Sequence, residues 1–184
     1  MSHWNSRGLR GSSLEELINY TNERYTQKGL ALLQKIPTPI TPVKMDQEKG
    51  VISLAYFEKQ STVDYIGVAQ GVPLCFDAKE TGQKHLPLQN IHDHQMEFME
   101  HFKRQHGLTF LLVHFTAYDE YYLLPFEILQ QYWRGAQQGG RKSIPYAAFP
   151  KEYEIRKIDN GVLHYLDAVS RYLEASEKSN DEKR

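Results

Sequence analysis

The chain has 184 residues, of which 40% are hydrophobic and 24% charged, which suits one globular domain with a buried core. Its net charge of −1 differs from that of strongly basic nucleic-acid binders, and its single cysteine, Cys75, excludes an internal disulfide and a Cys-based zinc cage. Because the chain also lacks a membrane-spanning apolar run and the apolar segment of a secretory signal, we expect a cytoplasmic protein without a membrane partner.

The first predicted element is a helix over residues 11–29. Ser12 and Ser13 each precede a glutamate by three residues, as in a capping box, and Gly29 suits the helix exit. A strand is predicted next, over residues 31–36.

A proline-led segment follows at residues 37–57. Its prolines, Pro37, Pro39 and Pro42, forbid a helix and favour an extended, stiff backbone. Strand character resumes over 51–57. The segment is either a surface loop or edge hairpin, or an arm that projects to touch a partner, and the residues alone leave both interpretations open.

Helical and strand patterns alternate through the rest of the chain. This order predicts an α/β fold with a mixed central β-sheet flanked by helices, in a single domain of residues 1–184 with a disordered tail from about residue 176. Met96, Met99 and Phe102 mark the buried side of one helix. The expected elements are a helix over 92–106, strands over 108–116 and 120–124, a short helix over 125–133, a glycine-rich basic loop over 134–146 and a final helix over 161–176.

The sequence STVDYIGVAQGVPLCFDAK predicts a β-hairpin that turns at Gln70–Gly71. In this register Asp64 faces Asp77, and Thr62 faces Lys79. Since side chains alternate along strands, these four side chains share one face of the hairpin. The opposite, apolar face should point to the core and carries Val63, Tyr65, Leu74, Phe76 and Ala78.

Two facing carboxylates need a reason, because their Cβ atoms would lie only about 4.5–5.5 Å apart. Such proximity raises the pKa of one carboxyl group, and a hard divalent cation such as Mg²⁺ resolves the conflict. Lys79, beside Asp77, could then orient an attacking water or stabilise charge that develops on a scissile phosphate. Taken alone, however, an Asp, Asp and Lys triple of this spacing is more often a surface ion-pair patch.

His92 and His94 could suggest a zinc site. On a helix, side chains two residues apart point roughly 200° away from each other, and helical zinc ligands prefer a spacing of four. We therefore expect these histidines to be helix caps or polar surface rather than metal ligands.

Several motifs, in order and with similar spacing over residues 9–144, resemble the RecU family of Holliday junction resolvases within the PD-(D/E)xK nuclease superfamily. They are RGSSLEELINYTNERY, KIPTPITPV, AYFEKQSTVDYIGV, FDAKET, LPLQNIHDHQ and GGRKSI. The resemblance implies a restriction-endonuclease-like fold and a homodimeric, Mg²⁺- or Mn²⁺-dependent endonuclease that cuts four-way DNA junctions by paired nicks. It also implies a link to a RecA-type recombinase.

The resemblance assigns roles to residues of this chain. Family metal ligands fall on Thr62, Asp64, Asp77 and Gln95, the catalytic lysine on Lys79, and a glutamate of the first helix on Glu15. The proline-led segment, about residues 37–57, corresponds to a stalk that enters the junction centre. Our candidates for contacts with DNA phosphates are Arg7, Arg10, Lys44, Lys59, Arg141 and Lys142.

The chain departs from the family pattern at Asp77, where the family usually has glutamate. It is also one residue short between Thr81 and Pro87, and the C-terminal EASEKSNDEKR has no counterpart. A side chain one methylene shorter could shift a bound metal or change the preference between Mg²⁺ and Mn²⁺. Two further hypotheses stay open: a junction-binding protein with weak or no cleavage, and a nuclease of this fold that acts on other branched DNA.

Overall fold

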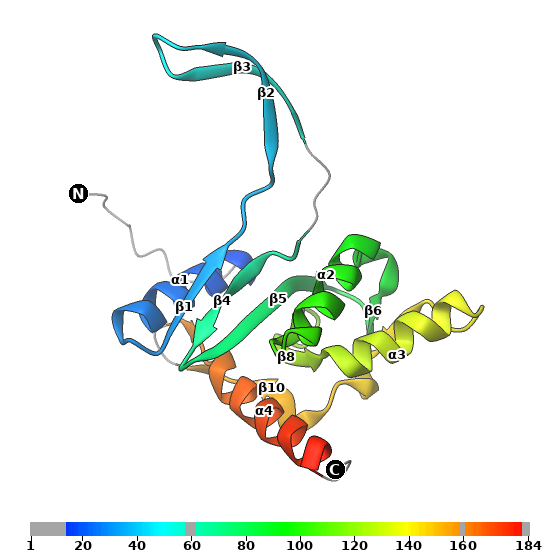
Figure 1. The fold of residues 1–184 in the computed structure, drawn as a ribbon. Helices are drawn as coiled ribbons and strands as arrows, with labels where there is room; N and C mark the ends of the chain where they lie inside the picture. The colour runs from blue at the N-terminus through cyan, green and yellow to red at the C-terminus, as the bar shows by residue number, and fades with distance from the viewer. Residues whose placement is uncertain (1–13, 58–61, 159–160, 182–184) are drawn as a thin grey trace.

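The computed structural model describes residues 14–57, 62–158 and 161–181. A six-stranded sheet lies at its centre with helices on both faces, and a two-stranded hairpin rises away from it (Figure 1). Neighbouring strands are antiparallel except β5 and β7, which are parallel, so the predicted mixed central sheet is confirmed. In spatial order the strands are β1 (Ala31–Lys35), β4 (Tyr65–Ala69), β5 (Val72–Thr81), β7 (Leu108–Phe115), β8 (Glu120–Pro125) and β10 (Glu154–Ile155).

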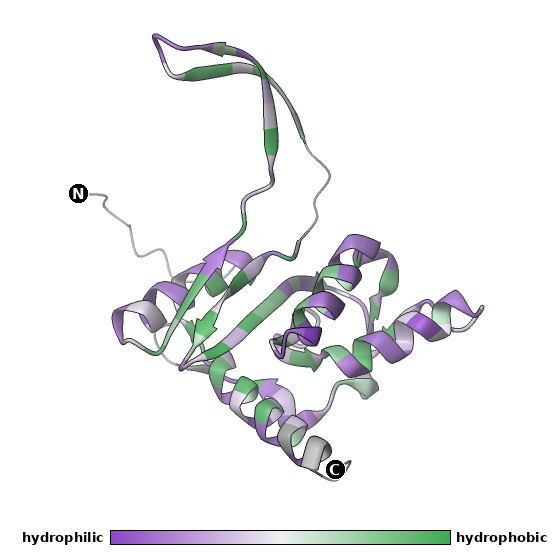
Figure 2. Ribbon diagram, viewed as in Figure 1, coloured by the Kyte–Doolittle hydropathy of each residue, from purple (hydrophilic) through white to green (hydrophobic). Residues whose placement is uncertain are grey.

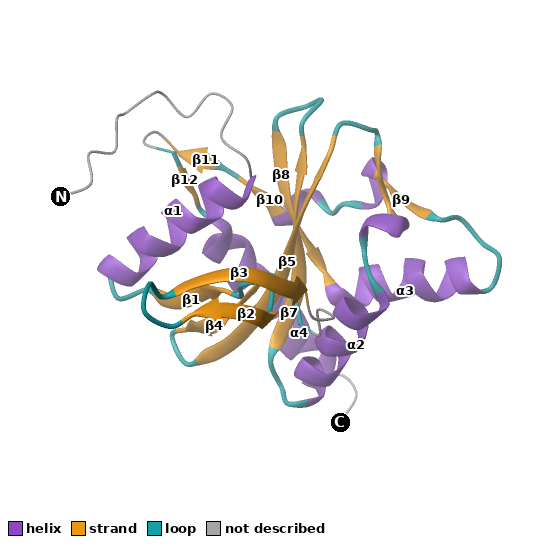
Figure 3. Ribbon diagram, turned by 90° about the horizontal axis from the view of Figure 1, so that it is seen from above, coloured by secondary structure: helices purple, strands orange, loops and turns teal. Residues whose placement is uncertain are grey.

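The helices cover the two faces of the sheet (Figure 3). Helices α1 (Leu14–Gln27) and α4 (Tyr165–Asp181) pack on one face, and α2 (Asp93–Arg104) and α3 (Phe126–Gln137) pack on the other. Because parallel strands need a long crossover, the chain between β5 and β7 has room for α2 and for the short elements β6 (His85–Pro87) and η1 (Leu88–Asn90).

Side-chain alternation on β5 divides the core into two layers. Leu74 and Phe76 point toward α1 and α4, whereas Cys75 points toward α2 and α3. The middle strands are therefore buried on both faces and read as nearly continuous apolar runs (Figure 2).

The hairpin of β4 and β5 has the predicted register. Tyr65 pairs with Phe76 and Ala69 with Val72. The turn residues Gln70 and Gly71 have φ values of 48° and 85°, as a two-residue type I′ turn requires. Register and turn therefore agree with the sequence-based prediction from Tyr65 to Phe76, whereas the predicted pairs Asp64–Asp77 and Thr62–Lys79 precede β4 and are not part of its ladder.

The prediction for Val63 was wrong. This side chain is buried with Cys75 against α2 rather than with Tyr65 against α1. The pleat ends at Tyr65, where β4 begins, and the preceding N–H of Asp64 donates to a side chain instead of to the backbone of β5. Strand alternation consequently does not extend to Val63.

The proline-led segment forms the projecting arm (Figure 1). Strands β2 (Ile40–Asp46) and β3 (Val51–Phe57) pair with each other and, within the described residues, form a two-stranded sheet separate from the central one. Large apolar side chains on it are exposed, including Tyr56 at 66% and Phe57 at 81%. The segment is therefore a hairpin that projects as an arm, and its contact with a partner stays a prediction.

The C-terminal third contains more regular structure than the sequence predicted. Helix α3 continues to Gln137 despite Gly135, because arginine, alanine and glutamine are good helix formers. Strand β9 (Ser143–Pro145) pairs with β6. The predicted loop over 134–146 therefore shrinks to residues 138–142. Short 3₁₀ turns, η2 (Tyr146–Ala148) and η3 (Lys151–Tyr153), lead into β10.

The final helix also differs from the prediction. A two-residue strand, β12 (Val162–Leu163), pairs with β11 (Lys157–Ile158), and α4 starts only at Tyr165. It then continues to Asp181 through the expected tail, since that stretch contains no proline or glycine to stop it. Among the described ranges, no helix combines the length and apolar character needed to cross a membrane.

Candidate active site

Asp64, Asp77 and Lys79 come together where β4 begins, near the base of the arm. The backbone N–H of Asp64 donates to Oδ1 of Asp77 at 3.1 Å, and the backbone N–H of Ala78 donates to Oδ2 of Asp64 at 3.1 Å. Each carboxylate thus accepts a hydrogen bond from a backbone N–H of the segment that carries the other acid. This reciprocal pair of bonds fixes the two acids next to each other.

Asp77 is fully buried. Its Oδ1 accepts the Asp64 N–H and a second hydrogen bond, at 2.9 Å, from Nε2 of Gln95. Its Oδ2 forms an ion pair with the ammonium of Lys79 and, in the part of the chain that the structure describes, accepts no hydrogen bond. The Lys79 side chain is itself only 14% exposed. A solvated surface ion-pair patch, the alternative we weighed from sequence, is therefore wrong.

The electrostatics of Asp64 follow from this crowding. Burial, and then repulsion by Asp77, raise the pKa of the Asp64 carboxyl group to about 6, while the Ala78 N–H and Lys79 act in the opposite direction. One ammonium thus serves two carboxylates, and the buried Oδ2 of Asp77 is left with that single partner. This donor set fits a hard divalent cation, which binds carboxylate oxygens and adds the missing positive charge.

Gln95 reaches the site through Asp77. It is 3% exposed, and while its Nε2 donates to Asp77, its Oε1 accepts the backbone N–H of His92 at 3.0 Å. That second bond belongs to a capping box at the start of α2. Both ends of the amide are therefore occupied, one on the acid and one on the helix.

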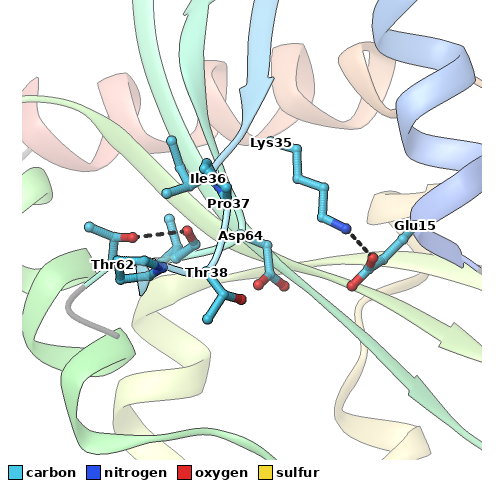
Figure 4. A pocket seen from close by; sticks show the side chains of 9 residues that line it. Glu15, Lys35, Ile36, Pro37, Thr38, Thr62 and Asp64 are labelled. Atoms are coloured by element: carbon cyan, nitrogen blue, oxygen red, sulfur yellow. Dashed lines mark hydrogen bonds and ion pairs between the residues drawn. The ribbon is translucent and has the colours of Figure 1, made fainter. Parts of the chain in front are cut away.

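A cavity of about 420 Å³ opens in front of Asp64 (Figure 4). Its wall contains two other predicted residues, Glu15 from α1 and Thr62, whose hydroxyl donates to the Val63 carbonyl at 3.3 Å. Asp77, Lys79 and Gln95 do not line this cavity; they connect to it through Asp64. The predicted catalytic and metal-binding residues thus form two sets that meet at Asp64, with Glu15 and Thr62 in the cavity wall and Asp77, Lys79 and Gln95 outside it.

Lys35 also lies in this cavity, although it was not among the residues predicted for the site. Its ammonium forms an ion pair with Glu15 (Figure 4). Lys35 pairs with Tyr65 across β1 and β4, so it is adjacent to Asp64 in the sheet. Its position depends on the β1–β4 pairing, and no local signal in the sequence indicates it.

His92 and His94 differ from the expected geometry. Their rings stack, with centroids 5.4 Å apart and planes at 15°, because His92 is the N-cap residue with extended φ and ψ rather than a helical residue. The expected cap position of His92 is confirmed. No group of three or more His, Cys, Asp or Glu side chains that could hold a metal ion occurs within residues 14–57, 62–158 and 161–181.

The candidate DNA-binding residues lie on separate parts of the molecule. Lys44 is exposed on β2 of the arm, whereas Arg141 and Lys142 are exposed on the loop before β9. That loop is tied to the lead-in of α2, because the Leu88 N–H donates to the Lys142 carbonyl at 3.1 Å. Outside the described residues lie Arg7, Arg10 and Lys59.

A mixed sheet flanked by helices, with two carboxylates and a lysine gathered beside one β-hairpin, is the arrangement expected of a restriction-endonuclease-like nuclease. The model of the family "Recombination protein U" (RecU) matches residues 9–171. The chain therefore belongs to the RecU family.

Relatives match over most of their length. The Holliday junction resolvase RecU of Limosilactobacillus reuteri is 43% identical over 178 residues, which cover 94% of this chain and 87% of that protein. The RecU of Oceanobacillus iheyensis is 42% identical over 173 residues, covering 92% and 85%. A solved structure of the Holliday junction resolvase Hjc from Archaeoglobus fulgidus aligns with a TM-score of 0.47 at 8% identity, over 74% of this chain and 91% of that one.

Proposed function

We propose that this protein is a divalent-metal-dependent endonuclease that resolves four-way DNA junctions by nicking two opposed strands. The observation that carries the proposal is the buried contact between Asp64, Asp77 and Lys79, at the base of an arm that projects from the sheet. Membership of the RecU family, whose relatives are named Holliday junction resolvases, supports the choice of substrate.

Asp64 and Asp77 would hold the cation, Mg²⁺ or Mn²⁺, with the Thr62 hydroxyl beside them. When bound, the cation supplies the charge that activates water and offsets the negative charge of the phosphodiester transition state. The Ala78 N–H keeps the Asp64 carboxylate pointed at this position, and the Asp64 N–H does the same for Asp77. Binding therefore needs no rearrangement of either strand.

Lys79 and Glu15 are the other proposed catalytic residues. The Lys79 ammonium is held against Asp77 in a largely buried position, where its charge can stabilise a phosphate in the transition state more strongly than it could in water. Glu15 faces the same cavity as Asp64 and holds Lys35 in place. Two ammonium groups thus flank the acids, that of Lys79 against Asp77 and that of Lys35 in the cavity wall.

Gln95 acts, in this proposal, as a positioning residue rather than as a direct metal ligand. Its Nε2 anchors Oδ1 of Asp77, and its Oε1 is engaged with the His92 N–H. The shorter Asp77 is thereby oriented from the start of α2. This differs from the ligand role that the family resemblance implies, and Gln95→Glu separates the two roles.

The arm is proposed to enter the junction centre. Its exposed apolar side chains would find partners among bases that lose their neighbours at the branch point, since base–aromatic stacking tolerates any sequence. Tyr56 and Phe57, at the base of the arm, are the most exposed of these side chains and lie on the chain segment that leads to Asp64. The active centre and the branch point would then be close together.

Two nicks require two active centres. A junction has two-fold symmetry, and a C2 dimer places two identical centres in matching positions, so we propose that a homodimer acts on the DNA. Phosphate contacts from basic side chains, including Lys44, Arg141 and Lys142, would make binding sensitive to salt.

The test compares cleavage of a synthetic four-way junction, a flap and a linear duplex in Mg²⁺ and in Mn²⁺. We expect paired nicks in the junction alone, and Asp64→Ala, Asp77→Ala and Lys79→Ala should abolish cutting while a gel shift shows that junction binding persists. Equal cutting of flaps would favour a nuclease for other branched DNA, and binding without cutting in either metal would favour a junction-binding protein. Undiminished cutting by Asp77→Ala would reject the site.

A further inference from the structure

An open groove of about 300 Å³ lies between α3 and the η1 segment that leads into α2. Its floor consists of Leu88 and Ile91, which are already buried in the core. Four further side chains form the accessible lining: Gln89 from η1, Trp133 and Gln137 from α3, and Lys142 from the loop before β9. Ala136 completes the wall.

The groove lining combines an aromatic ring, two side-chain amides and one ammonium group. Trp133 presents a partly exposed aromatic ring, and Gln89 and Gln137 are exposed amides that can each donate and accept hydrogen bonds. In the described part of the chain none of these side chains forms a hydrogen bond, and the ammonium of Lys142 has no ion pair. An aromatic face, two free amides and one free cation match the π-face, the polar edge and the phosphate of a nucleotide.

The groove is connected to the active site through the residues at the start of α2. Ile91, in its floor, is followed by His92, whose N–H is bound by Gln95, and Gln95 contacts Asp77. Lys142 is tied to the same segment through its carbonyl, which accepts the Leu88 N–H. The groove wall and the anchor of Asp77 are thus both attached to the start of α2.

From these observations we propose that the groove binds one unstacked nucleobase of the cut strand, between Trp133 and the amides of Gln89 and Gln137, with Lys142 on its phosphate. The groove would therefore set the base preference of cleavage. This inference rests on the proposed function, because it takes the substrate to be DNA. It assigns to the groove a reading role that neither the catalytic group nor the arm performs.

Trp133 provides a direct test that does not depend on cleavage. The chain has two tryptophans, Trp4 and Trp133, so Trp4→Phe leaves Trp133 as the single indole reporter. A four-way junction is added without divalent cations, so that the DNA stays intact. We expect base stacking to quench the Trp133 fluorescence at saturating junction. Unchanged fluorescence, or a change that follows protein concentration without DNA and so indicates a second copy in the groove, would overturn the proposal.

Base preference provides the second test. Cleavage is mapped on a set of junctions in which each base near the crossover is varied, and the ratio between the best and the worst site is measured. We expect Gln89→Ala and Gln137→Ala to reduce this ratio by about tenfold, the size of one lost base contact. Gln131→Ala is the matched control, because Gln131 is exposed on α3, as Gln137 is, but does not line the groove.

The outcomes separate this inference from the proposed function. A wild-type protein that cuts without base preference, or variants that retain the full preference, would overturn the groove's role while junction cleavage stands. Absence of any junction cutting by the wild-type protein would instead overturn the proposed function, and the fluorescence of Trp133 would still decide whether a base occupies the groove.

Discussion

Replacement of Asp64 by asparagine should remove the metal site and at the same time stabilise the metal-free protein. The carboxylate of Asp64 is crowded by Asp77, and its pKa is raised to about 6 by burial and by that neighbour. An amide of the same shape can still accept the Ala78 N–H through its oxygen, while its NH₂ group is a donor to Asp77. A repulsive contact is thus exchanged for a favourable one.

The sign and size follow from proton linkage. Between about pH 4 and pH 6 the folded wild-type protein holds a proton on Asp64 that the unfolded chain has lost, so stability falls as pH rises through this window and stays low above it. A displacement of about two pKa units corresponds to at most about 3 kcal/mol, and discounting for the partial exposure of Asp64 leaves about 1–2 kcal/mol. For a chain of this length, that is a gain in Tm of about 2–8 °C for Asp64→Asn at pH 8.

The assay is thermal unfolding in EDTA at pH 4 and pH 8, repeated with an excess of Mg²⁺ in place of EDTA. We expect the variant to exceed the wild type at pH 8, the difference to shrink at pH 4, and Mg²⁺ to raise Tm of the wild type alone. A variant that is less stable than the wild type at pH 8, or that Mg²⁺ stabilises equally, would refute the reasoning about paired acids.

Three further variants test other parts of the account. Gln95→Glu replaces the amide that donates to Oδ1 of Asp77 by a carboxylate, so we expect the cleavage rate to fall by about tenfold or more. A cleavage rate that is unchanged or higher would support direct metal ligation by residue 95. Gly67→Ala would place a Cβ 2.0 Å from the Leu32 carbonyl oxygen. We expect the free energy of unfolding, measured with denaturant, to fall by about 3 kcal/mol or more. A stability close to that of the wild type would disprove the tight β1–β4 contact. Replacement of residues 41–56 by a short Gly-Ser linker should preserve duplex affinity but abolish the preference for junctions in a competition gel shift; retention of that preference would argue against a role for the arm.

The catalytic hairpin was predictable because its signals are local. The Gln70–Gly71 turn and the alternation of the strands define the register, and the register places Asp64 beside Asp77. A type I′ turn permits few alternatives, and a slip of one residue would turn Phe76 to the opposite face of the sheet. The resemblance to RecU then added Gln95 and Glu15, which no local pattern connects to the hairpin.

Contacts between distant segments could not be predicted in the same way. Lys35 enters the cavity only because β1 pairs with β4, and the groove around Trp133 exists only because α3 extends past the predicted loop boundary. The burial of Val63 was mispredicted because alternation was extended beyond the point where β4 begins. In each case tertiary packing, rather than a local propensity, decides the outcome.

The most direct test of the central claim is to locate a bound metal ion by anomalous diffraction from crystals soaked in Mn²⁺ at a concentration that supports cutting. The account predicts one anomalous peak in contact with the carboxylates of both Asp64 and Asp77, absent from Asp64→Asn crystals. A peak at a different group of side chains, or no peak near these two acids, would contradict it.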